Sequence, residues 1–84
     1  MDSIISKLEE LIKKEMDKMD IILDSIVWIE EKNNNTLRVI LDKVNGIDLD
    51  TIVEATNIIN PILDETDLID EQYTLEVSSK ERGN

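Results

Sequence analysis

A strand, a tight turn and the start of a helix follow one another in Thr36-Leu37-Arg38-Val39-Ile40-Leu41-Asp42-Lys43-Val44-Asn45-Gly46-Ile47-Asp48-Leu49-Asp50. Every second residue of the first part is a large apolar one, at Leu37, Val39 and Leu41. This period predicts a β-strand with one apolar face, because successive side chains of a strand point to opposite faces. The opposite face would carry Arg38, Ile40 and Asp42.

The second part of this stretch predicts a turn that leads directly into a helix. Asn45 and Gly46 tolerate positive φ, so the chain can leave the strand there in a tight turn. Asp48 is placed as a helix N-cap, whose carboxylate accepts a hydrogen bond from a first-turn N–H. Asp50 adds negative charge at the positive end of the helix dipole.

The residues before this stretch predict a helix and a first strand. Apolar residues recur at helical spacing over 3–17, which predicts an amphipathic helix, and a domain of 84 residues needs that stripe for its own core. Residues 21–31 are rich in Ile, Val and Leu and predict a strand, in which apolar residues occur at both odd and even positions. Either a bulge shifts the inward set midway, or both faces are partly covered. Residues 32–35 predict a polar turn longer than two residues, with asparagines in left-handed conformations.

The residues after it predict a second helix, an acidic connector and a third strand. The helix should begin at Asp48 and bury Leu49, Ile52, Val53, Thr56, Ile59 and Leu63. Pro61 lacks an N–H and clashes with the preceding turn, so we expect a helix over 48–59 and then a kink or a fresh turn through 64. Residues 64–72 form an acidic connector. The alternation over 73–78 predicts a strand with Tyr73, Leu75 and Val77 inward.

These elements predict an α+β fold with the order α-β-β-α-β, in which two helices cover one face of a three-stranded sheet. The sequence leaves open whether the third strand lies beside the second or the first, and it leaves the oligomeric state open. Ile40, with Trp28 or Ile26, would remain on the uncovered face and invite a partner or a second domain.

Composition excludes several classes of chemistry. The 84 residues include no Cys and no His, so disulfides, thiolate zinc sites and imidazole bases are excluded. No glycine-rich phosphate loop or nucleophile motif occurs, and the residues around Gly46 do not fit a calcium loop. We therefore expect no enzyme, catalytic residue, metal, cofactor or small-molecule substrate. No targeting or membrane-length apolar segment occurs either, which predicts a soluble, cytoplasmic protein without a membrane partner.

Charge is unevenly distributed along the chain. Twenty acidic and nine basic residues give a net charge of −11, and residues 44–79 hold nine acids and no base. Such a surface repels phosphate backbones, so direct nucleic-acid binding by this domain is not expected, and basic proteins are better partners. Tyr73 as a base-stacking platform is disfavoured because acids surround it. An acidic surface also keeps many small domains soluble, so charge alone names no partner.

Three segments resemble the N-terminal domain of the RimP (YhbC) family of ribosome maturation factors. They are the strand, Gly-Ile turn and Asp48-Leu49-Asp50 helix start described above, then Ile62-Leu63-Asp64-Glu65-Thr66-Asp67-Leu68-Ile69, and finally Tyr73-Thr74-Leu75-Glu76-Val77-Ser78-Ser79. The order and spacing agree from about Met19 to Ser79. We therefore expect one domain over 1–79 and a polar tail over 80–84, without the second, SH3-like domain of the family.

The resemblance implies a cytoplasmic assembly factor that binds the immature small ribosomal subunit, through a basic ribosomal protein, and promotes its maturation without covalent chemistry. The alternative is a generic acidic interaction module that self-associates through the uncovered sheet face. Motif positions carried over from the family give these candidate contact residues: Arg38, Asp42, Asp48, Asp50, Asp64, Asp67, Glu76, Ser78 and Ser79. The positions that look structural are Gly46, Leu49, Leu63, Leu75 and Val77.

Overall fold

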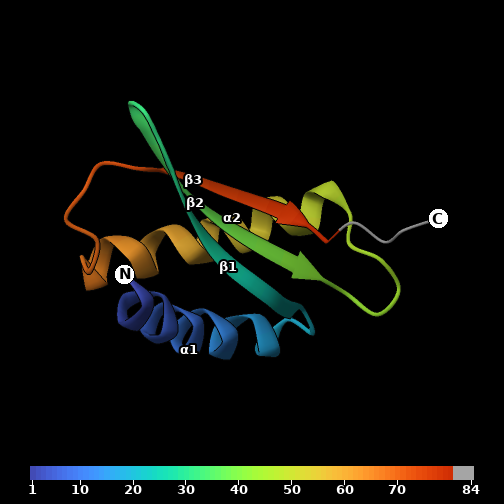
Figure 1. Ribbon diagram of the computed structural model, residues 1–84. Coiled ribbons are helices and arrows are strands. Elements are labelled where there is room, and N and C mark those ends of the chain that lie inside the picture. Colours follow the sequence, from blue (N-terminus) through green and yellow to red (C-terminus); the bar gives the residue numbers. More distant parts are fainter. Residues whose placement is uncertain (81–84) are drawn as a thin grey trace.

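The computed structural model describes residues 1–80 and confirms the predicted order of elements. The chain forms α1 (Asp2–Lys18), β1 (Ile22–Glu31), β2 (Asn34–Asp42), α2 (Leu49–Thr66) and β3 (Thr74–Ser79) (Figure 1). Of the predicted polar tail, residues 81–84 lie outside the described residues.

The three strands form one mixed sheet in the order β1-β2-β3. β1 and β2 are antiparallel, whereas β2 and β3 are parallel and are joined through α2. This order places β3 beside β2, which the sequence left open. The ladder extends past β3, since the N–H of Lys80 donates to the carbonyl of Leu41 at 2.7 Å.

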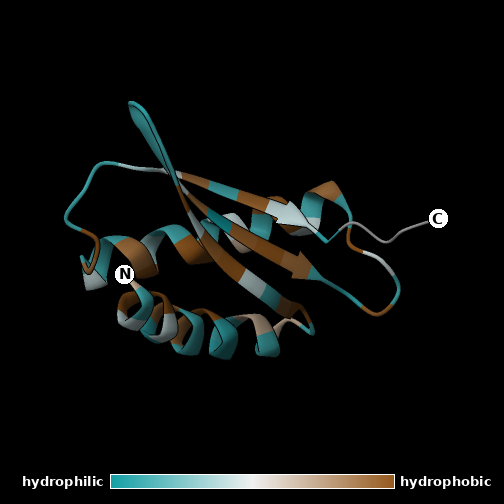
Figure 2. Ribbon diagram, viewed as in Figure 1, coloured by the Kyte–Doolittle hydropathy of each residue, from teal (hydrophilic) through white to brown (hydrophobic). Residues whose placement is uncertain are grey.

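Both helices cover the same face of the sheet, so the fold is the predicted two-layer α+β fold. The sheet contributes Leu37, Val39 and Leu41, all fully buried. The helices contribute Leu8, Ile12, Met16, Ala55, Ile59 and Leu63. Figure 2 shows hydrophobic residues along the strands and hydrophilic residues at the hairpin tip. Leu75 and Val77 of β3 pack against this core, as predicted.

A β-bulge explains why apolar residues occur at both odd and even positions of β1. Leu23 pairs with Leu41, but the next paired residue is Ser25, so Asp24 is the extra residue. The inward set therefore changes parity, from Leu23 before the bulge to Ile26 and Trp28 after it. Ile26 and Trp28 face the helices, and neither lies on the uncovered face where one of them was expected.

The β1–β2 hairpin is tighter than predicted. Glu31 pairs with Asn34, so only Lys32 and Asn33 form the loop. Among the described residues other than glycine, positive φ occurs at Asp20 and Asp67, so no loop asparagine is left-handed. The prediction of a longer turn was wrong because Asn34 and Asn35 continue the strand ladder, where backbone pairing outweighs their turn preference.

α2 is longer than predicted and runs through Pro61 to Thr66. Asn57 and Pro61 both lie on the exposed side of the helix. The carbonyl that loses its partner at proline can therefore bind water, which explains why the helix does not end there. It ends at Asp67, which is left-handed with φ 47 and ψ 41, and whose N–H donates to the carbonyl of Leu63 at 3.0 Å. The acidic connector consequently begins at 67, since Asp64 and Glu65 are helical.

The buried face of α2 also differs from the predicted one. Leu49 is 75% exposed and Val53 is 51% exposed, whereas Ala55, Ile59 and Leu63 are buried. At about 100° per residue, positions 49 and 53 are turned roughly 80–120° away from Ile59, the centre of the buried stripe. Leu49 therefore has no structural role in the core.

Candidate partner-binding surfaces

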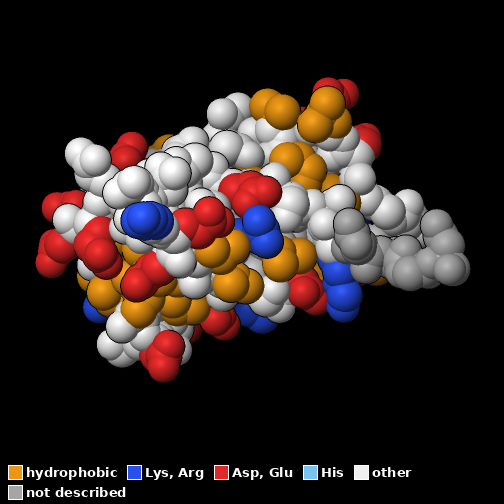
Figure 3. Space-filling view, turned by 45° about the horizontal axis from the view of Figure 1, so that its top comes forward, with side chains coloured by type: hydrophobic (Ala, Val, Ile, Leu, Met, Phe, Trp, Pro, Cys, Tyr) orange, Lys and Arg blue, Asp and Glu red, His pale blue; other side chains and the backbone are white. Residues whose placement is uncertain are grey.

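The uncovered face of the sheet brings together residues from all three strands. Arg38 lies opposite Val27 on one side and Glu76 on the other. We call this the outer sheet face; its outward-facing residues after the bulge are Ser25, Val27, Ile29, Glu31, Asn34, Thr36, Arg38, Ile40, Thr74, Glu76 and Ser78. Figure 3 is turned toward this face and shows charged side chains of both signs beside hydrophobic ones.

Two ion pairs neutralise charges on the outer sheet face. The Nε of Arg38 donates to Oε2 of Glu76 at 2.8 Å, and the two side chains are 42% and 45% exposed. At the β1 side, Nζ of Lys80 lies 3.1 Å from Oδ1 of Asp24. A shallow groove of about 520 Å³ runs between these pairs and is also lined by Ile40, Ser78 and Ser79. The face is therefore nearly neutral, although the domain as a whole is strongly acidic.

Asp42 lies at the end of β2, where this face meets the turn. Its carboxylate is half-buried and accepts a hydrogen bond from the N–H of Lys43 at 2.8 Å. The turn that follows is closed by the N–H of Gly46, which donates to the carbonyl of Lys43 at 2.9 Å. Gly46 has φ 89, so the predicted need for positive φ is confirmed. Asp42 is positioned to shape this turn.

Asp48 and Asp50 lie at the start of α2. Asp48 is the N-cap, and its Oδ1 accepts a hydrogen bond from the N–H of Thr51 at 2.8 Å, as predicted. Hydrogen bonds from the side chain and the backbone of Thr51 lower the pKa of Asp48 below its ordinary value of 3.8. Asp50 lies in the first turn, where the helix dipole favours an anion. These two acids stabilise the helix start.

Asp64 and Asp67 lie at the opposite end of α2. Together with three neighbours they form what we call the C-terminal acidic cluster: Asp64, Glu65, Asp67, Asp70 and Glu71. This end of a helix carries the negative end of the dipole, and the described last turn of α2 contains no basic residue. Figure 3 shows acidic side chains gathered at the end of the molecule where the connector to β3 lies. Asp64, Glu65 and Asp67 are thus placed where they cost helix stability.

The predicted contact residues therefore fall into three separate places. Arg38, Glu76, Ser78 and Ser79 lie together along β2 and β3, with Asp42 at the end of β2. Asp48 and Asp50 lie at the start of α2, and Asp64 and Asp67 lie at its end. The length of the helix, about 26 Å for its 18 residues, separates these two pairs of acids. The structure does not bring all nine residues into one site.

The family model that describes the RimP N-terminal domain matches residues 6–80. The chain belongs to the RimP N-terminal domain family. The match begins within α1 and runs through β3, so it covers most of the first helix as well as the segments that carry the resemblance. Membership in the RimP family gives the domain a role in ribosome maturation and implies a cytoplasmic location. The family is one of maturation factors and is not known as an enzyme family.

Sequence reasoning missed an aromatic pair in this RimP domain, beside the C-terminal acidic cluster. The rings of Trp28 and Tyr73 meet edge to face, with centroids 6.0 Å apart and an interplanar angle of 61°. Burial raises the pKa of the Tyr73 hydroxyl, and the charges of Asp64 and Asp67 raise it further. One ring comes from β1 and the other from the residue just before β3, so the sequence carries no local signal for the pair.

A second missed contact ties the hairpin to the same end of the molecule. The side-chain amide of Asn35 donates to the carbonyl of Gln72 at 3.2 Å. A shallow polar depression of about 550 Å³ lies beside this contact, lined by side chains that include Asn60, Asp64 and Glu71. The hairpin, the connector and the end of α2 thus form one continuous surface.

The described residues show neither a metal site nor a membrane span. Residues 1–80 contain no group of three or more His, Cys, Asp or Glu side chains that could hold a metal ion. Neither helix in this part of the chain is long and apolar enough to cross a bilayer.

Proposed function

We propose that this RimP-family domain binds the immature small ribosomal subunit through a basic ribosomal protein and promotes maturation without covalent chemistry. The C-terminal acidic cluster is the main contact, with Asp64 and Asp67 at its centre. The proposal is carried by the position of these acids, because an uncompensated acidic group at a helix C-terminus costs stability that a cationic partner would recover.

The distribution of charge supports the same choice of partner. Residues 44–79 contain nine acids and no base, so the field around α2 and the connector is negative throughout. Such a field attracts a basic protein and speeds its association, whereas it repels bare RNA. In this proposal a second, nearly neutral contact is formed by Arg38, Asp42, Glu76, Ser78 and Ser79. Asp48 and Asp50 contribute long-range attraction.

Co-sedimentation with purified small ribosomal subunits tests the proposal. The isolated domain should pellet with the subunits at low salt, and an excess of unstructured RNA should not displace it. A domain that remains in the supernatant, or that RNA displaces readily, contradicts the proposal.

Self-association through the outer sheet face is a second candidate, favoured by the 40% exposure of Val27 on that face. Sedimentation equilibrium distinguishes the two, since a self-associating domain gains mass with concentration in the absence of any ribosomal component.

A further inference from the structure

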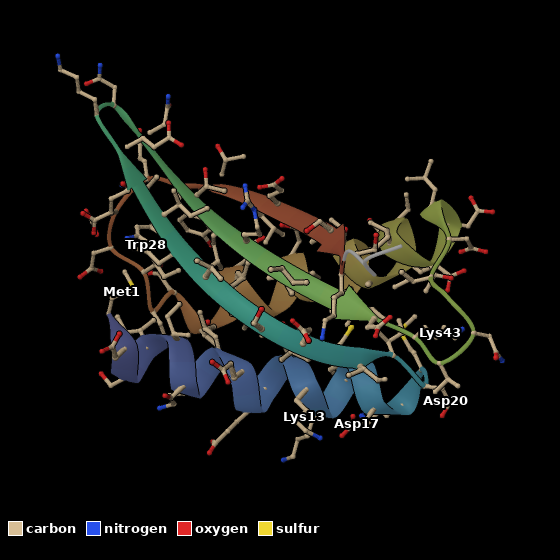
Figure 4. The ribbon with its side chains drawn as sticks, turned by 45° about the vertical axis from the view of Figure 1, so that its right-hand side comes forward. Met1, Lys13, Asp17, Asp20, Trp28 and Lys43 are labelled. Atoms are coloured by element: carbon tan, nitrogen blue, oxygen red, sulfur yellow. The ribbon has the colours of Figure 1, made fainter. Side chains whose placement is uncertain are left out.

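The outermost strand β1 has a free edge. β2 is its one neighbour in the sheet, and within residues 1–80 no residue of β1 exchanges backbone hydrogen bonds with anything except β2. Figure 4 shows β1 along the outside of the sheet with α1 beneath it. A free edge presents a row of N–H and C=O groups that can pair with another strand.

The hairpin register identifies which groups point outward. Glu31 and Asn34 are paired across a two-residue loop, so they form the hydrogen-bonded pair that closes the hairpin. Pairing is regular back to Ser25, and hydrogen-bonded pairs therefore alternate along the strand. The N–H and C=O groups of Ile26, Trp28 and Glu30 consequently face the free edge.

β1 is much less protected than the other edge of the sheet. β3 is six residues long and carries the charged Glu76 near its middle, and both features discourage pairing. β1 is ten residues long, and its segment from Ser25 to Ile29 contains no charge and no proline. The bulge at Asp24 limits the accessible edge at one end and leaves this uncharged segment open.

Charge decides which kind of strand fits. Asp24 precedes the uncharged segment and Glu30 and Glu31 follow it, and β1 contains no basic residue. In a second copy paired antiparallel about Val27, Asp24 would oppose Glu30, and like charges directly opposite one another are destabilising. The charge of Lys80 offsets that of Asp24 in part, so Glu30 and Glu31 supply most of the negative charge along this edge. A cationic strand avoids this repulsion.

We propose that the free edge of β1 adds an extended, cationic segment of the partner protein as a fourth strand of the sheet. The inference rests on the proposed function, because it names the part of the basic partner that docks. The segment would carry Lys or Arg opposite Glu30, and β-branched residues at the alternate positions, beside Val27 and Ile29 on the outer sheet face.

Amide exchange with a defined peptide tests the edge directly. The probe is a nine-residue peptide in which lysine alternates with valine, and its control replaces each lysine by glutamate. The lysine peptide should slow exchange of the Ile26, Trp28 and Glu30 amides at least about tenfold, whereas Val27 and Ile29 already bond to β2 and should not change. Protection elsewhere, or equal protection by both peptides, overturns the proposal. Slower exchange of these amides when the domain is concentrated without any peptide also overturns it.

Two variants then connect the edge to the ribosomal partner. Glu30→Pro removes the outward N–H at a position where an edge strand tolerates proline, and Glu30→Ala removes the same charge while keeping the N–H. Glu30→Pro should bind small subunits at least about fivefold more weakly than Glu30→Ala, with the circular dichroism of both unchanged.

The outcomes separate the two proposals. Equal binding of the two variants to subunits, with the wild type still bound, overturns the edge and leaves the proposed function standing. Absence of wild-type binding to subunits, with the peptide still protecting the edge amides, overturns the proposed function and supports the edge as a site for cationic strands.

Discussion

Arg38 and Glu76 are 38 residues apart in sequence and form an ion pair of 2.8 Å across the parallel strands β2 and β3. The pair lies on the outer sheet face, where both side chains are close to half exposed. Solvent screens such pairs, so a double-mutant cycle with Arg38→Met and Glu76→Gln should give a coupling of less than about 1 kcal/mol in urea unfolding. A coupling of several kcal/mol would show that another layer covers this face in solution.

The N-cap of α2 makes stability depend on pH. The pKa of Asp48 is lowered in the folded state, so its contribution is fully present above the ordinary value of 3.8 and is lost as the pH falls through the folded value. Asp48→Ala should lower the urea midpoint at neutral pH, and the difference from the wild type should shrink in acid. Asp48→Asn keeps the capping acceptor and should lose less at neutral pH. Equal midpoints for wild type and Asp48→Ala at neutral pH would contradict the cap.

Two apolar residues of α2 should respond very differently to truncation. Ile59 is fully buried, so Ile59→Ala should cost about 2–5 kcal/mol in the free energy of unfolding. Leu49 is 75% exposed, so Leu49→Ala should change it by less than about 0.5 kcal/mol. Urea denaturation of both variants measures the contrast, and a large loss for Leu49→Ala would place this side chain in the core after all.

The surroundings of Tyr73 can be read from its own titration. Burial, Asp64 and Asp67 raise its pKa above the ordinary value of 10.0. The double variant Asp64→Asn, Asp67→Asn should lower the pKa toward that value without reaching it, because burial remains. The ultraviolet absorbance of tyrosinate follows the titration, and Asp50→Asn is the control. A pKa that does not respond would mean that these acids lie away from the ring.

Elements with local signals could be predicted from the sequence. The alternation of Leu37, Val39 and Leu41 and the Asp48 cap depend on residues within a few positions, so the strand and the start of α2 were confirmed. The bulge in β1 was one of two alternatives, and pairing with β2 was needed to choose between them.

The errors and the open questions concern non-local relationships. Whether Pro61 ends a helix depends on which side of the helix faces water, and whether Leu49 is buried depends on how α2 is rotated on the sheet. The parallel pairing of β2 with β3 joins segments more than thirty residues apart. The separation of Asp48 from Asp64 follows from the length of α2, which the proline obscured.

Association kinetics of the isolated domain with purified small ribosomal subunits test the central claim most directly. The wild type is compared at low and physiological salt with a variant in which Asp64, Glu65 and Asp67 are Lys. A matched control replaces three other acidic residues, Glu9, Glu10 and Glu54, by Lys, so that both variants have equal net charge. The cluster variant should associate roughly tenfold more slowly than the control at low salt, and the difference should shrink as salt rises. Equal association rates for the two variants, or rates that do not depend on salt, would contradict docking through the C-terminal acidic cluster.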